Sequence, residues 1–219
     1  MAGIRRRQAL GLAVSRLARA QPGQRLAIAT GTVGGGYYPL GGGLANLQLL
    51  GANRVGMVFT QVDTAMDALR DEDRFRNRAM PVRAVAVLYT NRMQVVTTAA
   101  SGIQRFEDLK GKRISSGVPG SWTEVVTFRP LEAARLDKDR DFRARERLSP
   151  NESSNAMKDG KLDPFFFTGR VPTGGIMDLA ATAGTEIRLL DHGHLVPALI
   201  RKSGPAHVAE AIPPGSFPS

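Results

Sequence analysis

The sequence predicts an α/β protein built as two lobes on either side of a cleft. Short apolar runs of strand character alternate with amphipathic stretches of helical character, which is typical of parallel α/β sheets. The 219 residues, 42% hydrophobic and 23% charged, suffice for a sizeable core. Two polar breaks, at residues 88–92 and 191–194, divide the chain so that its middle part forms a lobe inserted into the other. A cleft between two lobes is a common place for a small ligand.

The elements follow one another along the chain. Strands are predicted at Leu26–Thr30, Val55–Thr60, Val82–Tyr89, Met93–Thr98, Arg113–Ser116, Phe165–Phe167 and Ile187–Leu190. Helices are predicted at Tyr38–Leu50, Val62–Arg70, Thr123–Ala134, Glu152–Asp159 and Gly175–Ala183. Lobe 1 then comprises residues 21–92 together with 191–219, and lobe 2 comprises residues 93–190.

Composition narrows the function classes. The net charge of +10 suggests an anionic partner. Nucleic acid is the alternative reading, but the arginines are scattered and no nucleic-acid-binding motif is present. The absence of cysteine excludes disulfides, thiolate metal sites and cysteine nucleophiles. A generally positive field that attracts anionic solutes is therefore the favoured interpretation.

Residues 1–20 resemble a weak export signal. Arg5–Arg7 form a basic region, Ala9–Val14 a short apolar region, and the small residues ending at Ala20 a cleavage site. The paired arginines are also typical of the twin-arginine route. An amphipathic surface helix is the alternative. No run reaches the ~18 apolar residues that would span a bilayer.

The glycine-rich stretch Thr30–Gly43 lies between a predicted strand and a predicted helix. It fits neither the dinucleotide fingerprint nor the Walker A pattern. A strand, a glycine turn and a helix N-terminus nevertheless present free backbone amides to a ligand. Tyr37 adds an apolar ring and a hydroxyl at the edge of the predicted cleft. The alternative interpretation is a flexible connector.

A second loop of this kind, Gly117–Glu124, follows the predicted strand Arg113–Ser116. Ser121 or Thr123 is a natural N-cap for the next helix, and the helix N-terminus favours an anion. By itself the pattern could be an ordinary capped helix. Opposite the glycine-rich stretch, it predicts a two-sided receptor for a carboxylate.

The strand Phe165–Phe167 is expected to alternate its side chains between the two faces of a sheet. Its end at Thr168 should face the cleft, because ligands gather at the carboxyl ends of parallel strands. No acid–base or nucleophile pattern is evident. His192 and His194 are weak metal candidates without further ligands. We therefore predict no catalytic residue, no metal and no cofactor.

Five segments, in this order, resemble one family. They are Ala29–Gly42, Phe59–Ala65, Phe106–Arg113, Gly117–Thr123 and Asp159–Phe167. From about residue 25 onward the chain is similar to the TAXI-type solute receptors, the extracytoplasmic substrate-binding components of tripartite ATP-independent periplasmic (TRAP) transporters.

The resemblance implies a two-lobed clamp of the periplasmic-binding-protein type II fold, located in the bacterial periplasm. Such a receptor is not an enzyme. It captures a small organic anion, an amino acid or other carboxylate, and delivers it to a TRAP membrane permease, acting as a monomer without nucleic acid. By motif, the expected ligand contacts are Thr30, Gly31, Thr32, Tyr37, Gln61, Gly120, Ser121, Trp122, Thr123 and Thr168.

Three departures from the family pattern qualify the resemblance. The family has a small residue where this chain has Trp122, and the indole would either stack on the ligand or fill part of the pocket. After Gly43 one strand of lobe 1 is missing, so the first lobe is expected to be incomplete. Relatives continue beyond residues 212–215. Two alternatives follow: a small α/β enzyme acting on an anionic metabolite, and a truncated remnant of the receptor that does not bind.

Overall fold

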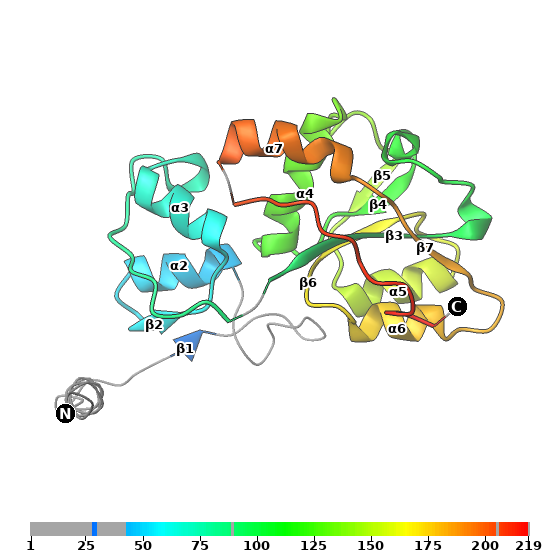
Figure 1. The fold of residues 1–219 in the computed structure, drawn as a ribbon, viewed down its shortest axis with the longest axis horizontal. Helices are drawn as coiled ribbons and strands as arrows, with labels where there is room; N and C mark the ends of the chain where they lie inside the picture. The colour runs from blue at the N-terminus through cyan, green and yellow to red at the C-terminus, as the bar shows by residue number, and fades with distance from the viewer. Residues whose placement is uncertain (1–27, 30–42, 89, 205, 219) are drawn as a thin grey trace, which may run out of the picture.

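The protein contains two sheets of unequal size, each with its own helices (Figure 1). The computed structural model describes residues 28–29, 43–88, 90–204 and 206–218. We call residues 43–88 with β1 the smaller unit, and residues 92–203 the larger unit. The predicted α/β fold class is confirmed. The division of the chain into lobes stays a prediction.

The larger unit is built on a five-stranded mixed sheet in the order β5-β4-β6-β3-β7. Its strands are β3 (Arg92–Thr98), β4 (Arg113–Ser115), β5 (Ala144–Glu146), β6 (Phe165–Gly169) and β7 (Ile187–Leu189). β4 runs parallel to β5 and β6, whereas β3 runs antiparallel to β6 and β7. The expectation of a parallel sheet is thus correct for β4, β5 and β6 and wrong for β3.

Helices cover both faces of this sheet. α4 (Trp122–Ala133) lies on one face, and α5 (Pro150–Lys158) and α6 (Gly174–Ala180) lie on the other. Phe166 packs on the α4 side, while Phe165 and Phe167 pack against α5 and α6, which confirms the predicted alternation. Short 3₁₀ turns occur at Ala99–Ser101 (η2) and Phe106–Leu109 (η3).

Local sequence explains where these helices begin. Ser149 and Glu152 form a capping box at the start of α5, and Pro150 occupies its first turn. Ser121 caps α4 by accepting a hydrogen bond from the Glu124 amide at 3.2 Å, as one of the two predicted caps. The two helices follow β5 and β4, which belong to the parallel part of the sheet.

The smaller unit contains a two-stranded parallel sheet and two helices. β1 (Ile28–Ala29) pairs with β2 (Met57–Val58), and α2 (Gly43–Gly51) and α3 (Val62–Arg70) follow β1 and β2 respectively. A 3₁₀ turn, η1 (Asp73–Phe75), comes after α3. Leu47, Ala68 and Phe75 form the core of this unit.

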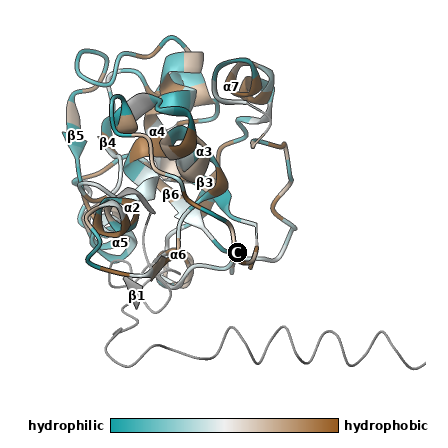
Figure 2. Cartoon of the chain, turned by 90° about the vertical axis from the view of Figure 1, so that its left-hand side faces the viewer, coloured by the Kyte–Doolittle hydropathy of each residue, from teal (hydrophilic) through white to brown (hydrophobic). Residues whose placement is uncertain are grey.

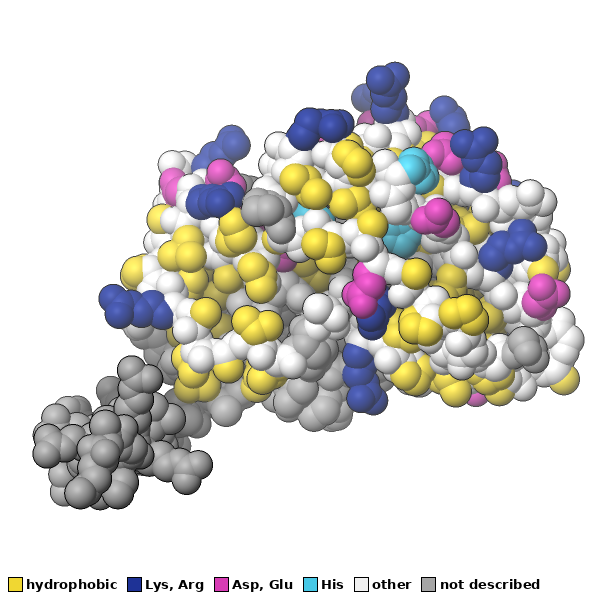
Figure 3. Space-filling model, in the orientation of Figure 1, with side chains coloured by type: hydrophobic (Ala, Val, Ile, Leu, Met, Phe, Trp, Pro, Cys, Tyr) yellow, Lys and Arg dark blue, Asp and Glu magenta, His cyan; other side chains and the backbone are white. Residues whose placement is uncertain are grey.

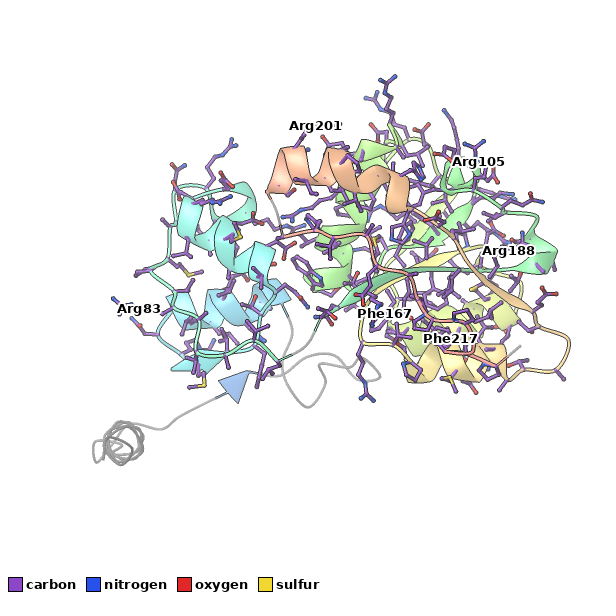
Figure 4. All side chains as sticks on the ribbon, in the orientation of Figure 1. Arg83, Arg105, Phe167, Arg188, Arg201 and Phe217 are labelled. Atoms are coloured by element: carbon purple, nitrogen blue, oxygen red, sulfur yellow. The ribbon has the colours of Figure 1, made fainter. Side chains whose placement is uncertain are left out.

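The C-terminal part of the chain contacts both units. After η4 (Gly193–Leu195), α7 (Val196–Ser203) lies against α4 and shows both hydrophobic and hydrophilic turns (Figure 2). Gly204, directly after α7, lies close to α3 of the smaller unit: a Cβ atom added to it would be 3.5 Å from Arg70 Nη1. The segment then crosses in front of α4 and β3, and Phe217 packs beside Phe167 in the cluster of α5 and α6 (Figures 1 and 4).

One predicted strand is wrong and two elements were not predicted. Residues 82–88 form neither helix nor strand, although their sequence is rich in β-branched residues. A strand needs a neighbour, and the described part of the chain offers none to this segment. β5 was missed because Ala144–Glu146 has no apolar run, and α7 because its Pro197 resembles a break.

Phe166→Ala tests the packing of the larger unit. The side chain is 2% exposed, so its removal should lower the free energy of unfolding by about 3–5 kcal/mol. Val208→Ala is the matched control, because Val208 is 74% exposed and its truncation should change stability by less than ~0.5 kcal/mol. Urea unfolding followed by circular dichroism measures both. Equal losses in the two variants would contradict the described core.

Candidate functional site

The candidate site lies where the smaller and larger units meet. Three segments contribute: the start of α3, the start of α4, and the carboxyl end of β6. The backbone amide of Thr168, on β6, donates to Thr123 Oγ1 on α4 at 3.2 Å. Trp122 packs with Leu47 and Ala68 of the smaller unit. Two of the predicted ligand residues, Thr123 and Thr168, are therefore in direct contact.

The loop before α4 is already occupied by a carboxylate of the protein itself. Glu124 Oε2 accepts a hydrogen bond from the Gly120 amide at 2.9 Å, and Oε1 accepts one from Arg147 Nε at 2.7 Å. Glu124 is 2% exposed. Sequence reasoning missed this residue, although the Ser-x-x-Glu spacing from Ser121 to Glu124 is a capping signal that could have indicated it.

Trp122 fills the space between the units. Its ring packs in one apolar cluster with Leu47, Ala68 and Phe75. Of the two roles considered for this indole, the filling role matches this packing. Its Nε1 is buried and has no hydrogen-bond partner in the described part of the chain.

Gln61 is positioned at the start of α3. Its Oε1 accepts a hydrogen bond from Asn91 Nδ2 at 3.1 Å. Asn91 precedes Arg92, which is the strand partner of Gly169 at the end of β6. The structure thus brings Gln61 to the same edge as Thr168. The other predicted contacts, Thr30, Gly31, Thr32 and Tyr37, lie outside the described residues.

A buried ion-pair cluster joins α3 to α4 beside the candidate site. Arg129 Nη1 donates to Asp63 Oδ2 at 2.8 Å, and Nη2 donates to Asp67 Oδ2 at 2.6 Å. The three side chains are 5–11% exposed. The Arg129 guanidinium also lies 5.9 Å from the ring centroid of Trp122, a cation–π distance. One arginine therefore holds two acidic residues of the smaller unit against α4.

Burial dominates the electrostatics of this cluster. It raises the pKa of Asp63 to about 6 despite the attraction of Arg129, and the neighbouring Asp67 raises it further. His207 Nε2 lies 3.9 Å from Asp63 Oδ2. Burial and the nearby Arg129 lower the pKa of His207 below its ordinary value, which favours the neutral ring.

Several buried polar atoms before or within α3, α4 and β6 lack partners among the described residues. The described part of the chain offers no hydrogen bond to Thr60 Oγ1, Thr64 Oγ1, Trp122 Nε1, Thr127 Oγ1 or Thr168 Oγ1. An unsatisfied buried polar group costs about 1–3 kcal/mol, so such groups usually face water or a ligand. Trp122 Nε1 is a donor, and a threonine hydroxyl can donate or accept. All five atoms can therefore act as hydrogen-bond donors.

Sequence comparison assigns the family. The profile of the NMT1-like family matches residues 41–218, which is most of the chain. The chain belongs to the NMT1-like family. The specific resemblance to TAXI receptors of TRAP transporters goes beyond this match.

The NMT1-like chain is also similar to solved solute-binding proteins, at low identity. The periplasmic aliphatic sulphonate binding protein SsuA of Escherichia coli is 17% identical, with a TM-score of 0.44 over 69% of this chain and 45% of that one. The probable amino-acid ABC transporter extracellular-binding protein ytmK of Bacillus subtilis is 21% identical, with a TM-score of 0.44 over 83% and 67%. A putative L-cystine ABC transporter protein of Listeria monocytogenes is 21% identical, with a TM-score of 0.42 over 67% and 56%. The chain spans about half the length of the first of these, 45%.

His192 and His194 of the NMT1-like chain each have a polar contact of their own. His192 Nδ1 lies 3.0 Å from the Leu190 carbonyl oxygen, and His194 Nε2 lies 3.1 Å from Glu107 Oε1. Among the residues the structure describes, no group of three or more potential metal ligands comes together.

Across the same ranges, no helix combines the length and apolar character needed to cross a bilayer.

Arg129→Met tests the ion-pair cluster. The change leaves two buried carboxylates without their cation, so the free energy of unfolding at pH 7.5 should fall by about 3–5 kcal/mol. Lys158→Met is the control, because the Lys158–Asp178 pair is largely exposed and should contribute less than ~1 kcal/mol. Urea unfolding of both variants gives the comparison. A loss no larger for Arg129→Met than for the control would contradict the structural role of the cluster.

Asp63→Asn tests the pH dependence. The pKa of Asp63 is about 6 in the folded protein against 3.8 for the free group, so folding favours its protonated form. Its contribution is therefore fully present below pH 3.8 and is lost as the pH rises through about 6. The stability of the wild type relative to Asp63→Asn should increase as the pH is lowered from 7.5 to 4.5. A relative stability that stays constant, or falls, would contradict the burial of this carboxyl.

Proposed function

We propose that this NMT1-like protein is an extracytoplasmic receptor that captures a small organic anion between its two units and passes it to a membrane permease. The observation that carries the proposal is the set of buried, unpartnered polar atoms at the junction of α3, α4 and β6. The resemblance to TAXI receptors supports a TRAP-type permease and a periplasmic location. In this proposal the smaller unit falls within lobe 1, residues 21–92 plus 191–219, and most of the larger unit within lobe 2, residues 93–190; α7 belongs to lobe 1 by sequence, although it lies against α4.

The occupied loop before α4 changes where the acid group of the ligand would bind. Because the Glu124 carboxylate already accepts hydrogen bonds from the Gly120 amide and from Arg147, a ligand carboxylate at that amide would meet a like charge. Trp122 Nε1 and Thr168 Oγ1 remain available as donors in the described part of the chain. We assign the acid group of the ligand to these two atoms, with Thr60 and Gln61 facing its other end.

Ligand capture would act on the relative position of the two units. A bound anion contacts α4 and β6 on one side and the start of α3 on the other, so it favours the closed arrangement. The experiment is a thermal-shift and calorimetry screen of amino acids, dicarboxylates and alkanesulfonates, with circular dichroism and solution scattering of the free protein.

A bound ligand should raise stability by about 2.7 kcal/mol at a concentration 100 times its Kd. Thr168→Val and Trp122→Phe should each weaken binding by about tenfold, because each removes one hydrogen bond to the anion. Thr182→Val is the control: its hydroxyl bonds the Asp178 carbonyl, and ligand affinity should not change.

Three outcomes would count against the proposal. If no compound in the panel stabilises a chain that unfolds cooperatively, the receptor function is rejected. An expanded chain without a cooperative transition would instead favour the non-binding remnant. Equal affinity of Thr168→Val, Trp122→Phe and wild type for a ligand that does bind would place the site elsewhere.

A further inference from the structure

Arg170 lies where β6 ends and the candidate site begins. It directly follows Gly169, the last residue of β6, and it is exposed. The turn after the strand is held in place, because the hydroxyl of the buried Thr173 donates to the Arg170 carbonyl oxygen at 2.8 Å. This arginine therefore combines a fixed backbone position with a guanidinium group that solvent can reach.

The alternation of side chains along β6 places Arg170 on the α4 side of the sheet. Phe166 packs on that side, whereas Phe167 packs against α5 and α6. Thr168 and Arg170 follow Phe166 by two and four positions, so they belong to the same side. Arg170 is thus the next side chain beyond Thr168 on the face that carries the candidate site.

The register of the sheet brings Arg170 to the start of α3 as well. In the antiparallel pairing of β3 with β6, Arg92 lies opposite Gly169. Continuing this register by one pair sets Asn91 opposite Arg170. Asn91 Nδ2 donates to Gln61 Oε1 at 3.1 Å, and Gln61 is the residue before α3. Arg170 therefore belongs to the junction of α3, α4 and β6.

Within the described chain, Arg170 has no acidic partner. None of the ion pairs there includes it. Residues 1–62 contain no aspartate or glutamate, so no side chain of that range supplies a carboxylate either. The face of the molecule shown in Figure 3 carries basic side chains in the region where the two units meet. A guanidinium group at this position suits an acid group of a ligand, which it can bind with two parallel hydrogen bonds.

The acidic side chains around the junction are already engaged by the protein itself. The ion pairs are Asp63 and Asp67 with Arg129, Glu124 with Arg147, and Glu210 with Arg92. A ligand ammonium group would need an acidic partner on burial, because a buried charge is costly unless it is paired. The described junction thus offers an arginine to an acid group, while its carboxylates are committed to other arginines.

Two classes of ligand match these charges incompletely. A monocarboxylate or an alkanesulfonate has one acid group, which the donors at Trp122 and Thr168 would bind, and it leaves Arg170 without a counter-charge. An amino acid brings an ammonium group to carboxylates that already pair with arginines. A ligand with two acid groups and no ammonium group matches both the uncharged donors and the arginine.

We propose that Arg170 binds a second acid group of the ligand, so that the captured solute is a dianion of the dicarboxylate class without an amino group. This inference rests on the proposed function, in which Trp122 and Thr168 bind the first acid group and Gln61 faces the other end of the ligand. Arg170 lies at that other end. The two acid groups therefore occupy opposite ends of one ligand, and Arg170 determines specificity.

The test is calorimetry of the full chain with matched sets of small anions. The dicarboxylates run from succinate to adipate. The controls are monocarboxylates of the same chain length and the corresponding amino acids, aspartate, glutamate and aminoadipate. The preferred dicarboxylate should bind about tenfold or more tightly than its monocarboxylate and its amino-acid counterpart, because each control lacks the second acid group or adds an ammonium group.

Variants assign the preference to one side chain. Arg170→Gln removes the charge and should weaken binding of the preferred dicarboxylate by about tenfold to a hundredfold while leaving the monocarboxylate unchanged. Arg170→Lys should recover part of the loss, because it restores the charge without the planar group. Arg201→Gln is the matched control, since Arg201 is exposed on α7, and it should bind as wild type (Figure 4). Circular dichroism verifies that each variant is folded.

Three results would overturn the proposal. If a monoanion or an amino acid binds at least as tightly as every dicarboxylate, this ligand class is rejected while the receptor function stands. If Arg170→Gln keeps the wild-type preference for a dicarboxylate, Arg170 is a solvated surface residue and the second acid group binds elsewhere. If a cooperatively folded chain binds neither these compounds nor alkanesulfonates, the receptor function itself is rejected, and the role of Arg170 with it.

Discussion

The arrangement of the two units depends on one guanidinium group. Arg129 bridges Asp63 and Asp67, which lie one helical turn apart on α3, and so fixes α3 against α4. The two helices follow different sheets, and among the described residues no strand pairing connects those sheets. Removing charges from water is costly, so this contact is favourable only with the geometry it has, two short hydrogen bonds to one planar group.

The position of Trp122 follows from that contact. With α3 held against α4, the indole is enclosed by Leu47, Ala68 and Phe75, and its Nε1 is withdrawn from water. The same placement sets the start of α3 beside the start of α4. A polar site between the units is thus produced by an apolar and ionic contact next to it.

Local patterns were predictable, and contacts distant in sequence were not. α3 was predicted to the residue because its apolar spacing is clear and its polar flanks are sharp. The alternation of Phe165, Phe166 and Phe167 followed from strand geometry. The prediction of a strand over residues 82–88 was wrong because β-propensity describes how well a segment fits neighbouring strands, and the described chain provides no such neighbour.

The candidate site shows the same limit. The cap at Ser121 was evident from the sequence. The hydrogen bond from the Gly120 amide to the Glu124 carboxylate was not, because it depends on how the loop turns back on its own helix. The Arg129 cluster joins residues 62 and 66 positions apart, and in sequence its members resemble an ordinary solvated surface. Spacing along the chain carries no information about such a pair.

The route of the last residues limits how the two units can separate. His207 lies beside Asp63 of the smaller unit, Glu210 pairs with Arg92 at the start of β3, and Phe217 is anchored beside Phe167 on the far side of the sheet. This segment acts as a tether with three points of attachment. Only the first of these points lies on the smaller unit, so rotation of that unit away from α4 has to break the contact between His207 and Asp63, while the other two points keep the last residues on the larger unit.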